Sequence, residues 1–193
     1  MVKSKALILC EGGNDVGFLN KFCKYLKLDM KRIVIQKIGK EADKNGKSAF
    51  WKEATYRTIK QQVNLGMYSK ILFIVDADYP ENDVIYGGFD NSKKGLEKII
   101  ETLKFTEKAR YFIACDPINK IGNLEHLILS TIDDRKKECI NELLKCVLEM
   151  NVHSDKKIIL SSYEAIFKES PYNYTHDNFK ELRELILWLI KTE

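Results

Sequence analysis

Short apolar runs alternate with longer segments of helical spacing along most of this 193-residue chain. The runs are strand-sized and apolar for most of their length, which is typical of strands buried on both faces. They lie at residues 5–10, 33–38, 70–75 and 111–114. Apolar residues at helical spacing lie between them, at residues 15–28, 48–65 and 92–103. The alternation predicts an α/β fold with a mainly parallel four-stranded sheet and helices on both faces.

The C-terminal third of the chain has helical spacing from Asn123 onward. This spacing is interrupted near Thr131, at residues 151–154 and at residues 170–171. We therefore expect an α/β domain over residues 1–130 and a helical C-terminal extension over residues 131–193 that packs on it, either against the sheet or as a cap.

Residues that favour helix ends and loops lie between the predicted elements. Polar side chains suited to N-caps precede or begin the three helices, at Asn14, Ser48 and Ser92. Gly66 is placed to end the second helix. Two polar, glycine-containing segments are expected to be surface loops, at residues 39–47 and 79–91.

Two of the predicted strands run directly into acidic residues. Glu11, Gly12 and Gly13 follow the first strand, and Asp76 and Asp78 follow the third. Ligands bind at the carboxyl ends of strands in open α/β sheets, so we expect one acidic pocket there. The paired glycines allow the backbone to approach a phosphate closely, and the next helix offers it free N–H groups. The alternative is a tight turn in which the acids are incidental.

The spacing of Asp76 and Asp78 suggests a metal site. Residues two apart on a strand face the same side, and neighbouring carboxylates repel each other unless a cation neutralises them. Oxygen ligands suit Mg²⁺ or Mn²⁺, so the pair predicts a site for Mg²⁺ (or Mn²⁺). The alternative is a solvated turn before Pro80.

A third acidic position follows the fourth predicted strand. Glu125 comes after Gly122 and Asn123, at the expected start of a helix. The helix dipole favours a glutamate in the first turn of any helix, so a ligand and a plain helix start both stay open. Asp116, at the end of the fourth strand, leaves the same two alternatives.

Positive charge is concentrated in residues 31–60, with nine Lys or Arg against three Asp or Glu in a chain of net charge +4. Lys40 and Lys47, in a predicted loop, are candidates to contact phosphates, and the alternative is a solvated surface. Residues 45–48 end like a P-loop. That motif needs a glycine where this chain has Glu41, so we predict no Walker site.

Composition excludes several classes of protein. No apolar run approaches the roughly 20 residues of a membrane span, and no signal-peptide pattern is present. The five cysteines form no CxxC pair, and the three histidines match no zinc spacing. We expect a cytoplasmic protein with reduced thiols.

The acidic strand ends carry a family resemblance. A strand followed by Glu11-Gly12-x-x-Asp15, taken with a strand followed by Asp76-x-Asp78, resembles the TOPRIM domain. That domain occurs in topoisomerases, bacterial primases, OLD-family nucleases and RecR-type repair proteins. The resemblance covers residues 1–130 and implies a TOPRIM-like Rossmannoid fold.

A second resemblance covers most of the chain. The segment Gly-Asn-Leu-Glu-His-Leu at residues 122–127 is similar to part of a small, uncharacterised TOPRIM-like family, the DUF3226 type. The stretch at residues 179–189, which contains Trp188, resembles the end of that family.

The resemblance implies roles for matching residues. Glu11 would act as a general acid or base, or as a metal ligand in nuclease-like members. Asp76 and Asp78 would bind Mg²⁺, and Glu125, corresponding to an extra acid of the OLD-like members, would complete the site. No tyrosine-bearing cleavage domain is recognisable, so topoisomerase activity is not implied. An ATPase partner, which full OLD proteins carry in the same chain, would here be a separate chain.

These observations predict Mg²⁺-dependent phosphoryl transfer on nucleic acid, most simply by a nuclease that hydrolyses phosphodiesters. A non-catalytic TOPRIM-type module that binds nucleic acid or a protein partner is one alternative, and a small nucleotide-binding α/β protein is another. Convergence of all four acids on one ion favours the enzyme. A Glu125 that points away, with Asp78 paired to a lysine, favours the binding module.

Overall fold

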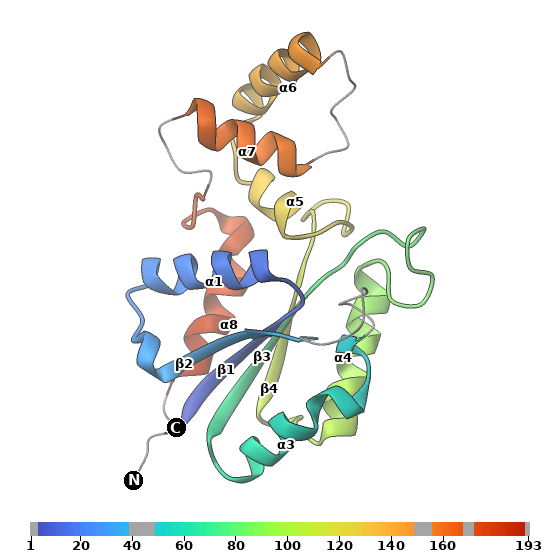
Figure 1. The fold of residues 1–193 in the computed structure, drawn as a ribbon, viewed down its shortest axis with the longest axis vertical. Coiled ribbons are helices and arrows are strands. Elements are labelled where there is room, and N and C mark those ends of the chain that lie inside the picture. The colour runs from blue at the N-terminus through green and yellow to red at the C-terminus, as the bar shows by residue number, and fades with distance from the viewer. Residues whose placement is uncertain (1–3, 39–48, 149–155, 168–171, 192–193) are drawn as a thin grey trace.

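Four parallel strands in the order β2-β1-β3-β4 form the central sheet, as Figure 1 shows. The strands are β1 (Lys5–Cys10), β2 (Ile33–Lys37), β3 (Tyr68–Asp76) and β4 (Ala109–Ala114). The structure is a computed structural model that describes residues 4–38, 49–148, 156–167 and 172–191. The predicted α/β fold with a parallel four-stranded sheet is confirmed.

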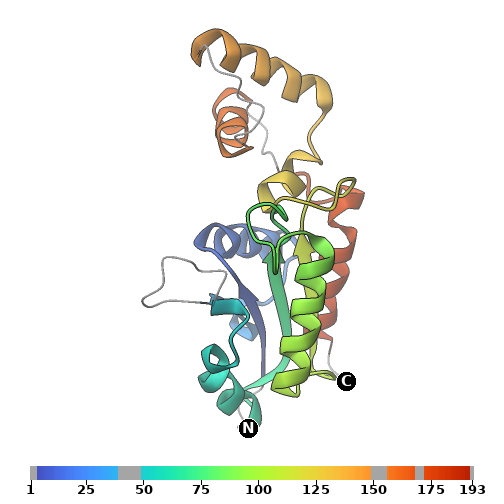
Figure 2. The same cartoon turned by 90° about the vertical axis from the view of Figure 1, so that its right-hand side faces the viewer.

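Helices cover both faces of the sheet. One face carries α1 (Gly13–Tyr25) and α8 (Lys180–Ile190), and the other carries α3 (Arg57–Asn64) and α4 (Phe89–Leu103), as Figures 1 and 2 show. The remaining helices are α5 (Leu124–Leu129), α6 (Asp134–Leu148) and α7 (Lys156–Ile166), with the 3₁₀ turns η1 (Met30–Arg32), η2 (Glu53–Tyr56) and η4 (Asp177–Phe179). No helix within the described ranges is long and apolar enough to cross a membrane.

Side-chain alternation in the strands divides the core into two layers. Ile8, Leu72 and Phe112 point to the layer that contains α1 and α8. Leu9 and Phe73 point to the layer that contains α3 and α4. Both sets are buried, which explains why the strands are apolar along most of their length rather than on alternate residues.

The helices of the C-terminal part pack in two different places. Helices α6 and α7 pack on each other beyond the carboxyl end of the sheet, and α7 also packs on α5 (Figure 1). Helix α8 returns to the sheet and contacts β1, β3 and β4. Its C-terminus is held by Lys70, whose Nζ donates to the carbonyls of Trp188 at 3.3 Å and Lys191 at 2.8 Å.

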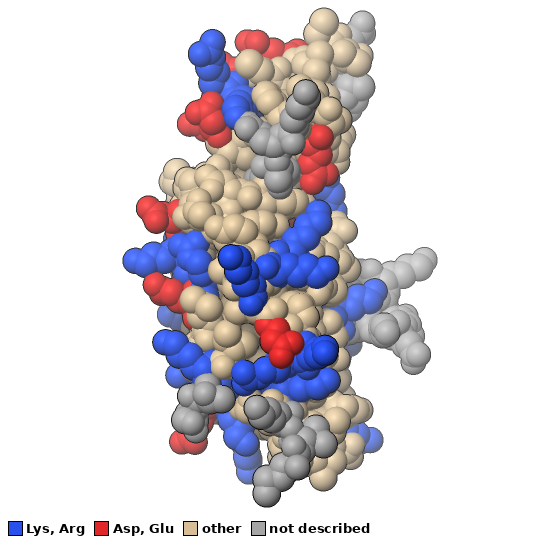
Figure 3. All heavy atoms as spheres, turned by 90° about the vertical axis from the view of Figure 1, so that its left-hand side faces the viewer, with Lys and Arg blue, Asp and Glu red and all other residues tan. Residues whose placement is uncertain are grey.

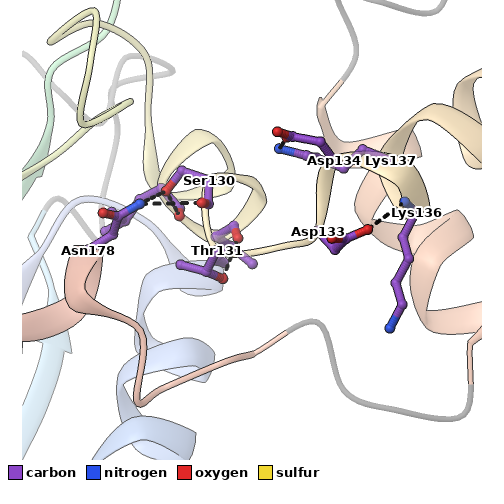
Figure 4. A network of polar contacts seen from close by, with 9 residues as sticks. Ser130, Thr131, Asp133, Asp134, Lys136, Lys137 and Asn178 are labelled. Atoms are coloured by element: carbon purple, nitrogen blue, oxygen red, sulfur yellow. Dashed lines mark hydrogen bonds and ion pairs between the residues drawn. The ribbon is translucent and has the colours of Figure 1, made fainter.

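Polar contacts hold the connection between α5 and α6, as Figure 4 shows. Asn178 of η4 donates from Nδ2 to the Ser130 hydroxyl at 2.8 Å, which joins the end of α5 to the start of α8. Asp133 accepts the Lys136 N–H at 3.3 Å at the start of α6. The predicted break near Thr131 is confirmed, and the two later breaks lie outside the described residues.

Two of the predicted N-caps are wrong. The N-cap of α1 is Gly12 rather than Asn14, and that of α4 is Gly88 rather than Ser92. Gly88 takes φ +86°, a left-handed value suited to glycine, and the chain enters the helix there. The buried Ser92 hydroxyl donates to the Tyr86 carbonyl at 2.7 Å instead of capping. The third proposed cap, Ser48, lies outside the described residues.

The predicted helix over residues 48–65 is also shorter than expected, because η2 precedes α3. The buried Tyr56 hydroxyl donates to the Phe50 carbonyl at 2.6 Å, and this contact curls the segment before α3 begins. Gly66 follows α3 at φ +72°, as expected for a residue that ends a helix.

Replacing Leu72 in the central strand β3 tests this two-layer core. Leu72 is fully buried, so Leu72→Ala should lower the free energy of unfolding by about 2–5 kcal/mol through lost burial and a residual cavity. Leu65→Ala is the matched control because Leu65 is 77% exposed, and we expect a change within about 0.5 kcal/mol. Urea denaturation measures both, and equal effects would contradict the described core.

Candidate functional site

The acidic residues lie at the topological switch point of the sheet. The chain leaves β1 toward β2 on one side and later returns to β3 on the other side of β1. The carboxyl ends of β1 and β3 therefore flank the position where open α/β sheets bind ligands. Glu11 directly follows β1, and Asp76 is the last residue of β3.

Glu11 and Asp76 join three segments of the chain. The Glu11 Oε1 accepts the backbone N–H of Asp76 at 3.3 Å. The Asp76 Oδ1 in turn accepts the backbone N–H of Leu124, at the start of α5, at 3.0 Å. The ends of the two central strands and the start of α5 are thus held together by two carboxylates.

Neighbouring negative charges oppose the ionisation of Asp76. Burial raises the pKa of Asp76 well above its usual value, and the charges of Glu11, Asp15 and Asp78 raise it further. The Leu124 N–H acts in the opposite direction but is outweighed. Such crowding favours a proton or a cation at this point, because either one reduces the repulsion.

The same negative charges also affect the pKa of the Cys10 thiol. Burial raises its pKa to about 12, with further contributions from the charges of Asp15, Glu11 and Asp76. A thiol with a pKa this high stays protonated at neutral pH, so Cys10 is unsuited to act as a nucleophile.

Asp15 belongs to the acidic cluster, although the sequence suggested only that it begins a helix. Its Oδ2 accepts the Gly12 N–H at 2.7 Å. Burial raises its pKa, the Gly12 hydrogen bond lowers it, and the charge of Glu125 raises it again. Asp15 and Asp76 both line a cavity of about 10 Å³, which has room for about one water molecule. The missed signal was a carboxylate three residues after an N-cap, as in a capping box.

Glu125 lies on the Asp15 side of the cluster. Its carboxylate is 4.0 Å from Nζ of Lys157 in α7, and its side chain is 16% exposed. The charge of Glu125 raises the pKa of Asp15. The charges that raise the pKa of Asp76 are instead those of Glu11, Asp15 and Asp78. The acids therefore form two adjoining groups, one around Asp76 and one around Asp15.

Asp78 does not continue the strand as its spacing suggested. β3 ends at Asp76, and Asp78 takes a left-handed backbone with φ +56°. Its N–H donates to the Gly122 carbonyl at 2.6 Å and its carbonyl accepts the Gly122 N–H at 3.1 Å. This bridge, rather than strand alternation, sets the position of Asp78 beside Asp76.

Tyr79, Asn123 and His126 form a second polar group that the sequence did not single out as a site. The Tyr79 hydroxyl and His126 Nε2 are 2.8 Å apart, and His126 Nδ1 is 2.6 Å from Asn123 Oδ1. Burial lowers the pKa of His126, and the charge of Lys156 lowers it further, while the charges of Asp116 and Glu125 act in the opposite direction, so the net effect favours the neutral imidazole. A Cβ on Gly122 would lie 2.7 Å from the ring, so glycine is required for this approach.

The two glycines after β1 differ in their surroundings. A Cβ on Gly12 would lie 3.3 Å from the Asp15 carboxylate, whereas a Cβ on Gly13 would meet nothing within 4 Å. Gly13 is exposed in the first turn of α1, at the edge of the acidic cluster. Lys40 and Lys47, the other candidate phosphate contacts, lie outside the described residues.

The carboxylates of this site suit a hard cation, although they do not converge on one point. Carboxylate oxygens are the ligands that Mg²⁺ and Mn²⁺ prefer. Within the described residues, no three His, Cys, Asp or Glu side chains are grouped in a way that could hold a metal ion. A bound cation would therefore require rotamer changes among the acids.

Comparison with protein families gives a match over residues 5–175, to the family described as "Protein of unknown function (DUF3226)". The chain belongs to this family. Comparison with curated proteins and with solved structures gives no match. The DUF3226 match spans both acidic strand ends, the Gly122–Leu127 segment and α7.

Asp76→Asn tests the electrostatics of this DUF3226 site. Because folding raises the pKa of Asp76, the folded protein holds the proton more tightly than the unfolded chain does. The free energy of unfolding therefore falls as pH rises from about 4 through the folded-state pKa. Asp76→Asn should reduce this fall and raise the free energy of unfolding at pH 8 by more than about 0.5 kcal/mol, the usual limit for surface substitutions.

Urea denaturation between about pH 4 and pH 9 measures this effect. Glu107→Gln is a control because it removes the same charge from an exposed position. A gain of equal size in Glu107→Gln, or no gain in Asp76→Asn, would contradict the proposed charge crowding.

Proposed function

We propose that this protein is a TOPRIM-like, Mg²⁺- or Mn²⁺-dependent phosphoryl-transfer enzyme that acts on nucleic acid, most simply a nuclease. The observation that carries the proposal is the contact between Glu11 and the Asp76 backbone at the switch point. It joins the two acidic strand ends that carry the TOPRIM resemblance. The raised pKa of Asp76 supports a cation at this point.

Each acid has a proposed role that follows from its position. Asp76 at the end of β3 and Asp78 beside it would hold the ion, and Glu125 would join them once its ion pair with Lys157 is broken. A bound Mg²⁺ supplies Lewis-acid polarisation of the phosphate and a more acidic water. Glu11, held by the Asp76 N–H, would accept the proton of the attacking water or donate one to the leaving oxygen.

The N-terminus of α1 supports a phosphate substrate. The N–H of Gly12 is already used by Asp15, but Gly13 is exposed and has open space around its Cα. Lys40 and Lys47 belong to the same proposal as sequence-based candidates for contacts with the nucleic-acid backbone.

A second candidate function is a non-catalytic module that binds nucleic acid or a protein partner. The ion pair of Glu125 with Lys157 favours it, because this acid is engaged away from Asp76. A separate ATPase chain stays a prediction from the resemblance to OLD proteins and is compatible with either function.

Removing the two aspartates at the end of β3 and just beyond it tests the enzymatic proposal. The wild-type protein should cleave single- or double-stranded DNA or RNA when Mg²⁺ or Mn²⁺ is added, and EDTA should stop the reaction. The Asp76→Ala, Asp78→Ala double variant should be at least about 100-fold slower, since a metal ion supplies several kcal/mol of charge stabilisation. Gel assays with end-labelled substrates measure the rates.

A control variant and a metal titration distinguish the possible outcomes. Glu107→Ala, at an exposed position, should cleave like the wild type. Mn²⁺ should raise the melting temperature of the wild type but not that of the double variant. Equal cleavage by the wild type and the double variant would overturn the site, and metal binding without cleavage of any substrate would favour the binding module.

Gly13→Ala separates the structural role of this glycine from its proposed role in binding. Alanine fits the open space and suits a helix better than glycine does, so stability should be unchanged or higher by up to about 1 kcal/mol. If a phosphate approaches this turn, the methyl group should raise KM for the nucleic acid. Gly122→Ala is the contrasting variant, and we expect it to lose stability because its Cβ meets His126. An unchanged KM in Gly13→Ala would exclude a close phosphate contact here.

A further inference from the structure

The face of the molecule formed by residues 16–38 is strongly basic. Residues 16–38 contain six Lys or Arg and a single acid, Asp29. The five lysines of this stretch are exposed, and none takes part in an ion pair with another described residue. They are Lys21, Lys24, Lys27, Lys31 and Lys37. Figure 3 looks onto this face and shows Lys and Arg gathered in a band over α1, η1 and β2.

Tyrosine rings lie directly beside these lysines. Tyr25, at the end of α1, is 45% exposed, and its ring centroid lies 5.0 Å from that of Tyr174. Tyr174 stacks on Tyr172 with ring centroids 5.6 Å apart and planes 3° from parallel. The Nζ of Lys21 lies 4.7 Å from the centroid of the Tyr172 ring. The segment before α8 thus adds two half-buried tyrosines to the basic face of α1.

The inner side of this tyrosine group is fixed to the core. Tyr174 packs edge-on against Phe22, with centroids 5.0 Å apart, and Tyr172 lies 5.9 Å from Phe18. Because Tyr25 packs on the anchored ring of Tyr174, a ligand that stacks on Tyr25 loses little additional side-chain entropy.

We propose that the face formed by Lys21, Lys24, Lys27 and Tyr25, which we call the α1 face, binds single-stranded nucleic acid. Exposed cations beside an aromatic ring are what single-strand binders use, since phosphates contact the lysines and a base stacks on the ring. A duplex offers no unstacked base to Tyr25. The proposal rests on the proposed function in one respect, because the bound strand is taken to be the substrate that reaches the acidic site.

The geometry of α1 connects this face to that site. Lys21 and Lys24 lie six and nine residues after Asp15 in the same helix, about 9 and 14 Å along its axis. At about 3.4 Å per nucleotide along one strand, a few nucleotides span that length. We therefore expect a strand on the α1 face to reach the end of the sheet where Glu11 and Asp76 lie.

Fluorescence anisotropy with a labelled 20-nucleotide dT strand in EDTA tests the proposal. Replacing Lys21, Lys24 and Lys27 together by Gln should weaken binding and reduce the slope of log K against log salt concentration by about 2, at about 0.7 per phosphate contact. The control replaces Lys93, Lys94 and Lys98, which are exposed on α4, by Gln and removes the same charge. We expect the control to bind with nearly the affinity and salt slope of the wild type.

Tyr25 is tested by two substitutions. Tyr25→Ala should weaken binding by about 5- to 100-fold because a stacked base is lost, whereas Tyr25→Phe should bind like the wild type. Circular dichroism and urea denaturation check that each variant is folded. The same anisotropy assay with an RNA strand and with a DNA duplex shows which nucleic acid is preferred.

The outcomes separate this proposal from the nuclease proposal. Equal losses in the two triple variants, no loss in the α1 variant, or tighter binding of the duplex would overturn the α1 face. Binding through the α1 face without cleavage in Mg²⁺ or Mn²⁺ would leave this inference standing and overturn the nuclease. If the wild type cleaves nucleic acid but the α1-face variants bind it as the wild type does, the α1 face is overturned and the nuclease proposal stands.

Discussion

Repulsion between carboxylates at the ends of β1 and β3 is the constraint to which the rest of the site responds. Burial raises the pKa of Asp76, and the charges of Glu11, Asp15 and Asp78 raise it further, so the fold keeps together groups that separate readily in water. Backbone N–H groups compensate in part, at Asp76 for Glu11, at Leu124 for Asp76 and at Gly12 for Asp15. Folded proteins concentrate such unfavourable charge at functional sites, because stability is lost there in exchange for reactivity or binding.

Chain segments after the sheet complete this arrangement. The start of α5 donates the Leu124 N–H to Asp76, and α7 supplies Lys157 to Glu125. The Asp78–Gly122 bridge and the Tyr79–His126 contact join the loop after β3 to the segment before α5. The acidic strand ends are therefore enclosed by elements that follow β4 in the sequence, so the site depends on much more of the chain than the sheet.

The sheet and its acidic edge could be predicted from the sequence because strands that are buried on both faces leave a strong local signal. The four apolar runs match β1 to β4, and the pairing of Glu11 with Asp76 follows from the parallel topology. Helix starts were harder to predict, since Gly12 and Gly88 cap through backbone conformation and Ser92 is engaged elsewhere. The direction of Asp78, the membership of Asp15 in the cluster and the Lys157 contact of Glu125 depend on tertiary packing, which single-sequence patterns do not encode.

The return of α8 to the sheet has a consequence for biosynthesis. Leu182, Ile186 and Leu189 are buried in the same core layer as Ile8 of β1, which lies more than 170 residues earlier in the chain. During translation this face of the sheet stays uncovered until residues 180–190 have left the ribosome, so the nascent chain exposes an apolar surface that chaperones recognise.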